Sequence, residues 1–303
     1  MAPAERSARR PLDAVALAHV LQRMWRAEAA PWLHGEVARR MAERLPVIKL
    51  QPERVIDWGA FLGAGRALLT ATYPRARVLA VESDTVRRDA TAAALEAPWW
   101  TPRRWAAAAP AVVTEADLGA GQGQLLWSNM GLHGAIDPQA VMAAWHRALA
   151  VDGFLMFSTL GPGSLEALRG LYAARGWPPP HAPFVDMHDL GDMLVEAGFA
   201  DPVMDQETIT LTWPSGEALL AELRQLGGNV DPRRFAGLRT PRWRSRLAEA
   251  LGAEAGPGGR PRLAMEVVYG HAFRAAPRPR VAAETALALD DMRAMIRAGR
   301  RPA

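Results

Sequence analysis

The sequence predicts an α/β protein in which helices flank a parallel sheet. Three apolar stretches carry this prediction, because each reads as a short buried strand: RVIDWG (54–59), RARVLAVES (75–83) and QLLWSNMGL (124–132). Each is followed by a turn and then by a helical pattern, and this alternation is typical of right-handed βαβ units. The chain has 303 residues, half of them hydrophobic, which is enough to bury a sizeable core.

The first half of the chain is expected to supply helices around these strands. Residues 12–45 have the spacing of an amphipathic helix, and Pro46 ends the pattern. GRALLTATY (65–73) predicts a helix that opens directly from a glycine turn, and TVRRDATAAALEA (85–97) predicts another. The segment 98–124 is rich in Pro, Gly and Trp, so irregular structure is expected there.

The second half continues the pattern and then changes it. Its expected elements are helices over 137–153, 164–176, 187–199 and 217–228, strands over 153–161 and 263–274, and an antiparallel hairpin over 201–213. From residue 276 onward the chain is rich in Pro and Arg, and we expect this tail to be disordered.

Composition excludes several classes of protein. The chain has no cysteine, so it has no disulfide and no thiolate metal site, and a cytoplasmic location is expected. No run of 18 apolar residues predicts a membrane span, and the N-terminus has no secretory signal. Arginines cluster between 233 and 246 without the aromatic interleaving typical of an RNA-binding platform, so nucleic acid is not expected as a partner. His133 and His146 have no carboxylate at ligand spacing, and no metal site is predicted.

The stretch VIDWGAFLGAGRALL (55–69) has the order strand, acid, glycine-rich turn, helix. Such turns bring backbone amides close to a ligand at a helix N-terminus. Glu82 ends the second strand 25 residues after Asp57, where an acid can bind ribose hydroxyls. Asp57 itself would repel a pyrophosphate but would suit a cationic ligand. On charge, the turn therefore favours S-adenosylmethionine over NAD.

Phe61 is the unusual residue of this turn. It stands where a small residue would let the backbone approach the ligand. Its ring either points away from the pocket or fills it, and the sequence leaves both alternatives open.

Five stretches of the C-terminal two thirds together resemble one family. They are LLWSNMGL (125–132), AVDGFLMFSTLGPGSLEALR (150–169), PFVDMHDLGDMLVEAGFADPVMD (183–205), ITLTW (209–213) and EVVYGHAF (266–273). In these motifs the chain is similar to the malonyl-acyl-carrier-protein O-methyltransferases of biotin synthesis. The resemblance runs from about residue 34 to residue 273.

The resemblance implies a Rossmann-like, seven-stranded class I methyltransferase fold with N-terminal helices and a C-terminal helical insertion. It divides the chain into an N-terminal helical lid (1–45), a methyltransferase domain (46–275) and the tail (276–303). The implied activity is S-adenosylmethionine-dependent methylation of the free carboxylate of malonyl-acyl carrier protein, by a monomer. In-line transfer to a carboxylate needs positioning and desolvation rather than a base, so no catalytic side chain is assigned.

The resemblance also implies the residues that bind the donor. Asp57, Gly59, Gly63 and Gly65 match the donor-binding turn, and Glu82 matches the ribose-binding acid. Asp117, or else Glu115, matches the acid that holds the adenine amine. Ser128 and Asn129 match residues near donor and acceptor.

The departures from the family concentrate in the half that binds the donor. Phe61 replaces a glycine, and His133-Gly134 stands where members have Gln-Trp. These departures keep a second hypothesis open, in which a degenerate methyltransferase fold no longer binds the donor and acts as a binding or regulatory subunit.

Other polar residues have both a structural and a functional interpretation. His188 lies in DMHDLGD, either in a helix cap formed by Asp186 or Asp189 or in an acceptor pocket. Tyr269 and His271 share one strand face, either as a buried polar pair or as acceptor contacts. A malonyl carboxylate requires a cation, and the candidates are Arg169, Arg175 and Arg224.

Overall fold

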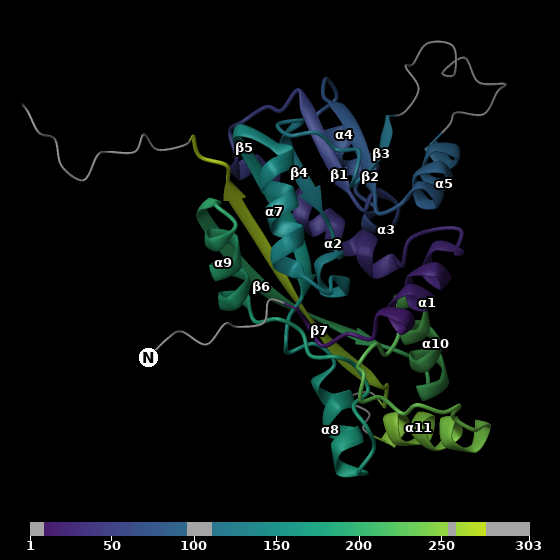
Figure 1. Ribbon diagram of the computed structural model, residues 1–303. Coiled ribbons are helices and arrows are strands. Elements are labelled where there is room, and N and C mark those ends of the chain that lie inside the picture. The colour runs from purple at the N-terminus through teal and green to yellow at the C-terminus, as the bar shows by residue number, and fades with distance from the viewer. Residues whose placement is uncertain (1–8, 96–110, 254–258, 277–303) are drawn as a thin grey trace, which may run out of the picture.

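A seven-stranded mixed sheet forms the centre of the protein, in a computed structural model that describes residues 9–95, 111–253 and 259–276 (Figure 1). Its strands are β1 (Arg54–Trp58), β2 (Arg77–Glu82), β3 (Val112–Thr114), β4 (Gly123–Ser128), β5 (Leu149–Leu160), β6 (Ala200–Thr212) and β7 (Arg262–Phe273). They lie in the order β3-β2-β1-β4-β5-β7-β6. The first five are parallel, and β7 runs antiparallel to both β5 and β6. The predicted α/β, seven-stranded architecture is confirmed.

Helices cover both faces of this sheet. They are α1 (Ala14–Trp25), α2 (Trp32–Ala42), α3 (Ala60–Gly63), α4 (Arg66–Thr72), α5 (Thr85–Leu95), α7 (Pro138–Ala148), α8 (Glu166–Ala174), α9 (Met187–Glu196), α10 (Gly216–Leu226) and α11 (Pro241–Ala253), with 3-10 turns η1 (Leu45–Val47) and η2 (Leu132–Gly134). Figure 1 shows α7 and α9 on one face and α2 and α4 on the other, while α8, α10 and α11 gather at the far end of the β6–β7 pair.

Two hydrophobic clusters, one on each face of the sheet, explain why helices cover both faces. Alternate residues of a strand point to opposite faces, so a strand buried on both sides reads as a continuous apolar run. In β5, Phe154 and Met156 join the cluster beneath α2, whereas Leu155 and Phe157 join the cluster beneath α7 and α9. The central strands are therefore held rigidly, and their carboxyl ends present a fixed edge.

Three expectations about the elements are corrected. The helix expected over 12–45 is two helices: Asp13 caps α1, and Pro31, which cannot continue a helix ladder, precedes α2. The hairpin expected over 201–213 is the single edge strand β6, whose residues alternate because only one of its faces is covered. The segment 98–124, expected to be irregular, contributes the short strand β3 and the start of β4. The tail expected to be disordered, from residue 277 on, lies outside the described residues.

Candidate functional site

A cavity of about 200 Å³ opens at the carboxyl ends of β1, β2 and β4, where ligands of open α/β sheets bind. The strand ends, the glycine turn, α1, α7 and the loop after β4 all contribute to its wall. The lining residues are Leu21, Trp25, Trp58, Gly59, Leu62, Glu82, Ser83, Arg87, Glu115, Ser128, Asn129, Gly131, Leu132, Gly134, Ala135, Val141 and Trp145. Of the residues assigned to the donor from the sequence, Gly59, Glu82, Ser128 and Asn129 line it. We name it the donor cavity.

Two left-handed residues shape the glycine turn, Gly59 before α3 and Ala64 after it. Gly59 has φ +69°, which an L side chain rarely adopts, and its amide donates to the Val81 carbonyl at 2.8 Å. This bend ends β1 and starts α3 at once. The Phe61 amide then donates to Glu82 Oε1 at 3.0 Å, so the turn and the end of β2 are tied together.

Asp57 lies directly beneath this turn and has no partner for its charge. Its carboxylate is completely buried, and among the described residues neither oxygen has a hydrogen-bond donor. Burial raises the pKa of Asp57 to about 7, and the Arg66 guanidinium offsets this only in part. A buried carboxylate without donors is costly, so the site favours a cation or hydrogen-bond donor that the described residues do not supply.

Two further acids lie at the neighbouring strand ends. Glu82 accepts hydrogen bonds from the Phe61 amide and from Thr91 Oγ1 at 2.9 Å, yet burial raises the pKa of its carboxyl to about 7. Glu115 also lines the cavity, and burial raises its pKa. Asp117 is exposed and accepts from Thr114 Oγ1 at 2.6 Å instead. The structure thus brings Glu115, the alternative to Asp117, to the cavity beside Glu82.

The remaining predicted residues lie behind the cavity wall or bridge its parts. Asn129 Nδ2 donates to the carbonyls of His34 and Gly63, at 2.8 and 2.7 Å, and its Oδ1 accepts from Ser158 Oγ at 2.6 Å. Gly63 is covered by Asn129, and Gly65 packs so closely on Trp127 that a Cβ would lie 2.4 Å from the indole nitrogen. Neither glycine lines the cavity; their small size lets α3 and α4 approach β4.

The Phe61 ring points away from the donor cavity. It stacks on Trp25 at the end of α1, with ring centroids 4.5 Å apart and an interplanar angle of 20°. Trp25, not Phe61, lines the cavity, and the Arg87 guanidinium lies 5.6 Å from the Trp25 ring centroid. The residue that replaces a family glycine therefore anchors the roof of the cavity and leaves the space within it open.

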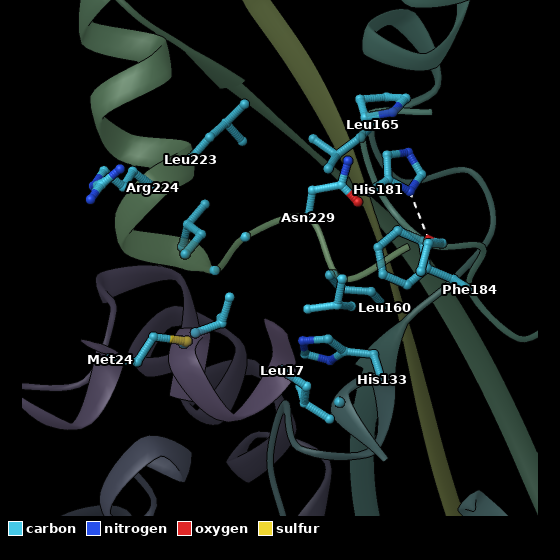
Figure 2. A pocket seen from close by; sticks show the side chains of 18 of the residues that line it. Leu17, Met24, His133, Leu160, Leu165, His181, Phe184, Leu223, Arg224 and Asn229 are labelled. Carbon is cyan, nitrogen blue, oxygen red and sulfur yellow. Dashed lines mark hydrogen bonds between the residues drawn. The ribbon is translucent and has the colours of Figure 1, made fainter. Parts of the chain in front are cut away.

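A second, larger cavity of about 490 Å³ lies between α1, α8, α10 and the loops before α9 and α11 (Figure 2). Its wall is mainly aliphatic, with Leu17, Leu160, Leu165 and Leu223 among the contributors. Figure 2 shows Arg224 on α10 at one side, and His133, His181 and Phe184 together at the other. We name it the acceptor cavity.

Three arginines and two histidines are among the polar residues that line the acceptor cavity. Arg10, Arg23 and Arg224 line it, and His133 Nδ1 and His181 Nε2 are buried there without a partner among the described residues. Burial lowers the pKa of His133 to about 3, so this ring is neutral at physiological pH.

Of the arginines proposed from the sequence, only Arg224 lines the acceptor cavity. Arg169 lies 3.6 Å from the carboxylate of Glu166, and Arg175 lies over the ring of Trp177. Sequence reasoning missed Arg10, because nothing in the N-terminal sequence indicates that it folds back onto the loop after β4.

The two cavities share part of one wall. Leu21 of α1, together with Gly131 and Gly134 of the loop after β4, lines both. Asp57 is buried behind the donor cavity and does not line it, but a cationic ligand in the donor cavity and an anionic ligand among the arginines would meet across this wall. Group transfer between two such ligands is the chemistry that the arrangement permits.

The motif residues with two interpretations are structural. Tyr269 donates its hydroxyl to Glu207, and the Arg44 guanidinium lies 3.9 Å from its ring centroid, which joins α2 to the β6–β7 pair. His188 is exposed and bonds Asp186 at 2.9 Å, while Asp186 caps α9. In the described ranges, no group of three or more His, Asp or Glu side chains is arranged to hold a metal ion. The helices within those ranges are also too short or too polar to cross a bilayer.

The chain is similar to known proteins over most of its length. A malonyl-[acyl-carrier protein] O-methyltransferase of Laribacter hongkongensis is 41% identical over 262 residues, which cover 84% of this chain and 86% of the relative. One from Gallionella capsiferriformans is 37% identical, covering 83% and 87%. No protein-family model matches the chain.

Solved structures show the same fold at low identity. The YcgJ protein of Bacillus subtilis superposes with a TM-score of 0.53 at 9% identity, covering 79% of this chain and 99% of YcgJ. BH2331 of Bacillus halodurans, a proposed methyltransferase, gives 0.51 at 13% identity, covering 78% and 100%. The fold is therefore the Rossmann-like one expected from the sequence.

Proposed function

This chain belongs to the malonyl-[acyl-carrier protein] O-methyltransferase family, and on that premise we propose that it methylates the free carboxylate of a malonyl group carried by acyl carrier protein. When bound, S-adenosylmethionine supplies a methyl group on a sulfonium, which a carboxylate oxygen displaces in line to leave a neutral thioether and a methyl ester. No proton moves in this exchange, so the protein needs no general base.

The observation that carries the proposal is the unpartnered carboxylate of Asp57. S-adenosylmethionine brings an ammonium and a sulfonium, and a positive charge above β1 would satisfy the two orphaned oxygens. The same charge would lower the pKa of Asp57 again. The residues present therefore fit the donor that the family uses.

The other residues of the donor cavity would orient and enclose this ligand. Glu82, at the end of β2, is placed to accept from ribose hydroxyls, and Glu115 takes the role first assigned to Asp117 toward the adenine amine. Asn129 holds the turn against α2 through its two carbonyl contacts. Trp25 roofs the cavity and would exclude water from the transfer.

We assign the malonyl thioester to the acceptor cavity. Its aliphatic wall suits the arm that carries the acyl group, and a guanidinium group in its lining suits the carboxylate. Acyl carrier protein would remain outside, with only the arm inserted. A monomeric state, a cytoplasmic location and the division into lid, methyltransferase domain and tail stay predictions from the sequence.

The hypothesis of a degenerate, donor-free subunit was based on departures from the family, among them Phe61 and His133-Gly134. Because Phe61 stacks on Trp25 and is not among the residues that line the donor cavity, this departure no longer favours the hypothesis.

Three measurements test the proposal. We expect calorimetry to give micromolar affinity for S-adenosylhomocysteine, and we expect labelled methyl to pass from S-adenosylmethionine to malonyl-acyl carrier protein but not to acetyl-acyl carrier protein. Expression of the chain should also restore growth of a biotin-requiring strain that lacks its own methyltransferase. The absence of binding at millimolar ligand would refute the enzymatic role, and binding without transfer to malonyl would refute the acceptor.

A further inference from the structure

Arg10 folds back from the N-terminal segment onto the acceptor cavity. Its backbone amide donates to the Ile136 carbonyl at 2.7 Å, and its guanidinium donates to the carbonyls of His133 and Pro183. These bonds fix the guanidinium against the loop that follows β4. A guanidinium has five N–H groups, so donors remain free after two backbone contacts.

The charge of Arg10 has no counter-ion among the described residues. Burial lowers its pKa to about 10, so the group stays charged at physiological pH. A half-buried cation that bonds only neutral carbonyls is costly to maintain, and it gains most from an anion that approaches through the cavity.

The other two arginines of the acceptor cavity are placed differently. Arg23 donates to the carbonyls of Arg224 and Gly227, at the C-terminal end of α10, where a cation is already favoured. Arg224 is exposed and lies across the cavity from His133 (Figure 2). Among the described residues, neither has a hydrogen bond to the residues that line both cavities.

Arg10, by contrast, contacts that wall directly. The carbonyl that it bonds belongs to His133, which lies between Gly131 and Gly134, and both glycines line both cavities. The oxygen that receives a methyl group must reach this boundary. A cation fixed here is therefore the one that can hold the reacting end of the acceptor rather than its carrier arm.

We propose that Arg10 binds the acceptor carboxylate and makes the enzyme specific for a malonyl over an acetyl thioester. The inference rests on the proposed function, because it concerns the acceptor of that reaction. The carboxylate meets the free N–H groups of a planar guanidinium, which can hold both oxygens while one of them points toward the donor cavity.

The test compares malonyl-CoA with acetyl-CoA, which carry the same arm and the same phosphates and differ only in the carboxylate. With S-adenosylhomocysteine saturating, we expect the wild type to bind malonyl-CoA roughly 10- to 100-fold more tightly, as one charge-assisted pair would give. Arg10→Gln should reduce this preference to about twofold and raise the KM for malonyl-acyl carrier protein, while Arg10→Lys should keep part of it. The affinity for S-adenosylhomocysteine should stay unchanged.

Arg224→Gln is the matched control, because it removes a guanidinium from the same cavity and should leave the malonyl preference intact. If Arg10→Gln weakens both thioesters equally, the residue only braces the loop, and the inference is wrong. The inference is also wrong if Arg224→Gln, rather than Arg10→Gln, abolishes the preference.

A failure of the proposed function would look different. A wild type that transfers no methyl to malonyl-acyl carrier protein refutes that function, whereas the thioester preference of the wild type and of Arg10→Gln still decides the role of Arg10. A wild type without any malonyl preference overturns the assignment of Arg10 itself.

Discussion

At the scale of single residues, the Asp57 carboxylate serves donor binding but lowers the stability of the donor-free protein. Its carboxyl has a pKa of about 7 when folded and an ordinary value near 3.8 when unfolded. Between these values the unfolded chain releases a proton that the folded chain keeps. The free energy of unfolding of the donor-free protein therefore falls as pH rises toward 7 and is constant above it.

Replacing Asp57 with Asn should remove this pH-dependent cost. In the absence of donor, the free energy of unfolding of Asp57→Asn should exceed that of the wild type by more at pH 8 than at pH 5. We expect the difference between the two pH values to be on the order of 3 kcal/mol. Urea unfolding at both pH values measures the difference. The same variant should lose at least about 100-fold in affinity for S-adenosylmethionine. Equal stability differences at both pH values would mean that Asp57 does not titrate as described.

Phe61 contributes to stability by stacking on Trp25, and it does not contact the donor cavity directly. We expect Phe61→Ala to cost about 1–2 kcal/mol of stability and to leave the affinity for S-adenosylhomocysteine unchanged or a few-fold weaker. A double-mutant cycle with Trp25→Ala should give a coupling of about 1 kcal/mol. A tenfold gain in affinity would instead show that the ring obstructs the donor.

At the scale of elements, the strand–turn–helix unit uses its glycines for different reasons. Gly59 has a positive φ, although a Cβ atom there would meet no other atom. Gly65 has an ordinary φ, but a Cβ atom there would overlap Trp127. A sequence motif makes these positions look equivalent, although one is a requirement of the backbone and the other of packing.

Alanine substitutions should separate these two requirements. We expect Gly59→Ala to cost about 1 kcal/mol, the strain of a left-handed L residue. Gly65→Ala should cost more, about 2–3 kcal/mol, because its Cβ overlaps a fully buried indole. Thermal unfolding of the two variants gives the comparison. Gly35→Ala, at an unhindered position inside α2, is the reference for a substitution without strain or overlap, and it should stabilise the protein by about 0.5–1 kcal/mol. An equal loss at both positions would contradict the distinction.

At the scale of the whole molecule, the sequence predicted the parallel half of the sheet well. Strands buried on both faces, such as β1 and β4, read as apolar runs, and their ends placed Glu82 and Asn129 correctly at one edge. The β6 strand was misread as a hairpin because an edge strand and a hairpin alternate in the same way. Only its pairing with β7 over its whole length distinguishes them.

The donor site was predictable in part, for a related reason. Residues at strand ends follow from the order of the strands, so Gly59, Glu82 and Ser128 could be found from their positions. The direction of the Phe61 ring depends on Trp25, which is 36 positions away and belongs to another helix. The position of Arg10 likewise depends on a backbone hydrogen bond to Ile136, and no sequence pattern in either segment indicates this contact.

The wall that both cavities share has a consequence for the order of events in a catalytic cycle. Leu21 of α1 lines both the donor cavity and the acceptor cavity. A displacement of α1 that admits one substrate would therefore also open the cavity that holds the other. Neither substrate can then dissociate freely while the other is enclosed. Turnover should proceed through a ternary complex, with each substrate lowering the dissociation rate of its neighbour.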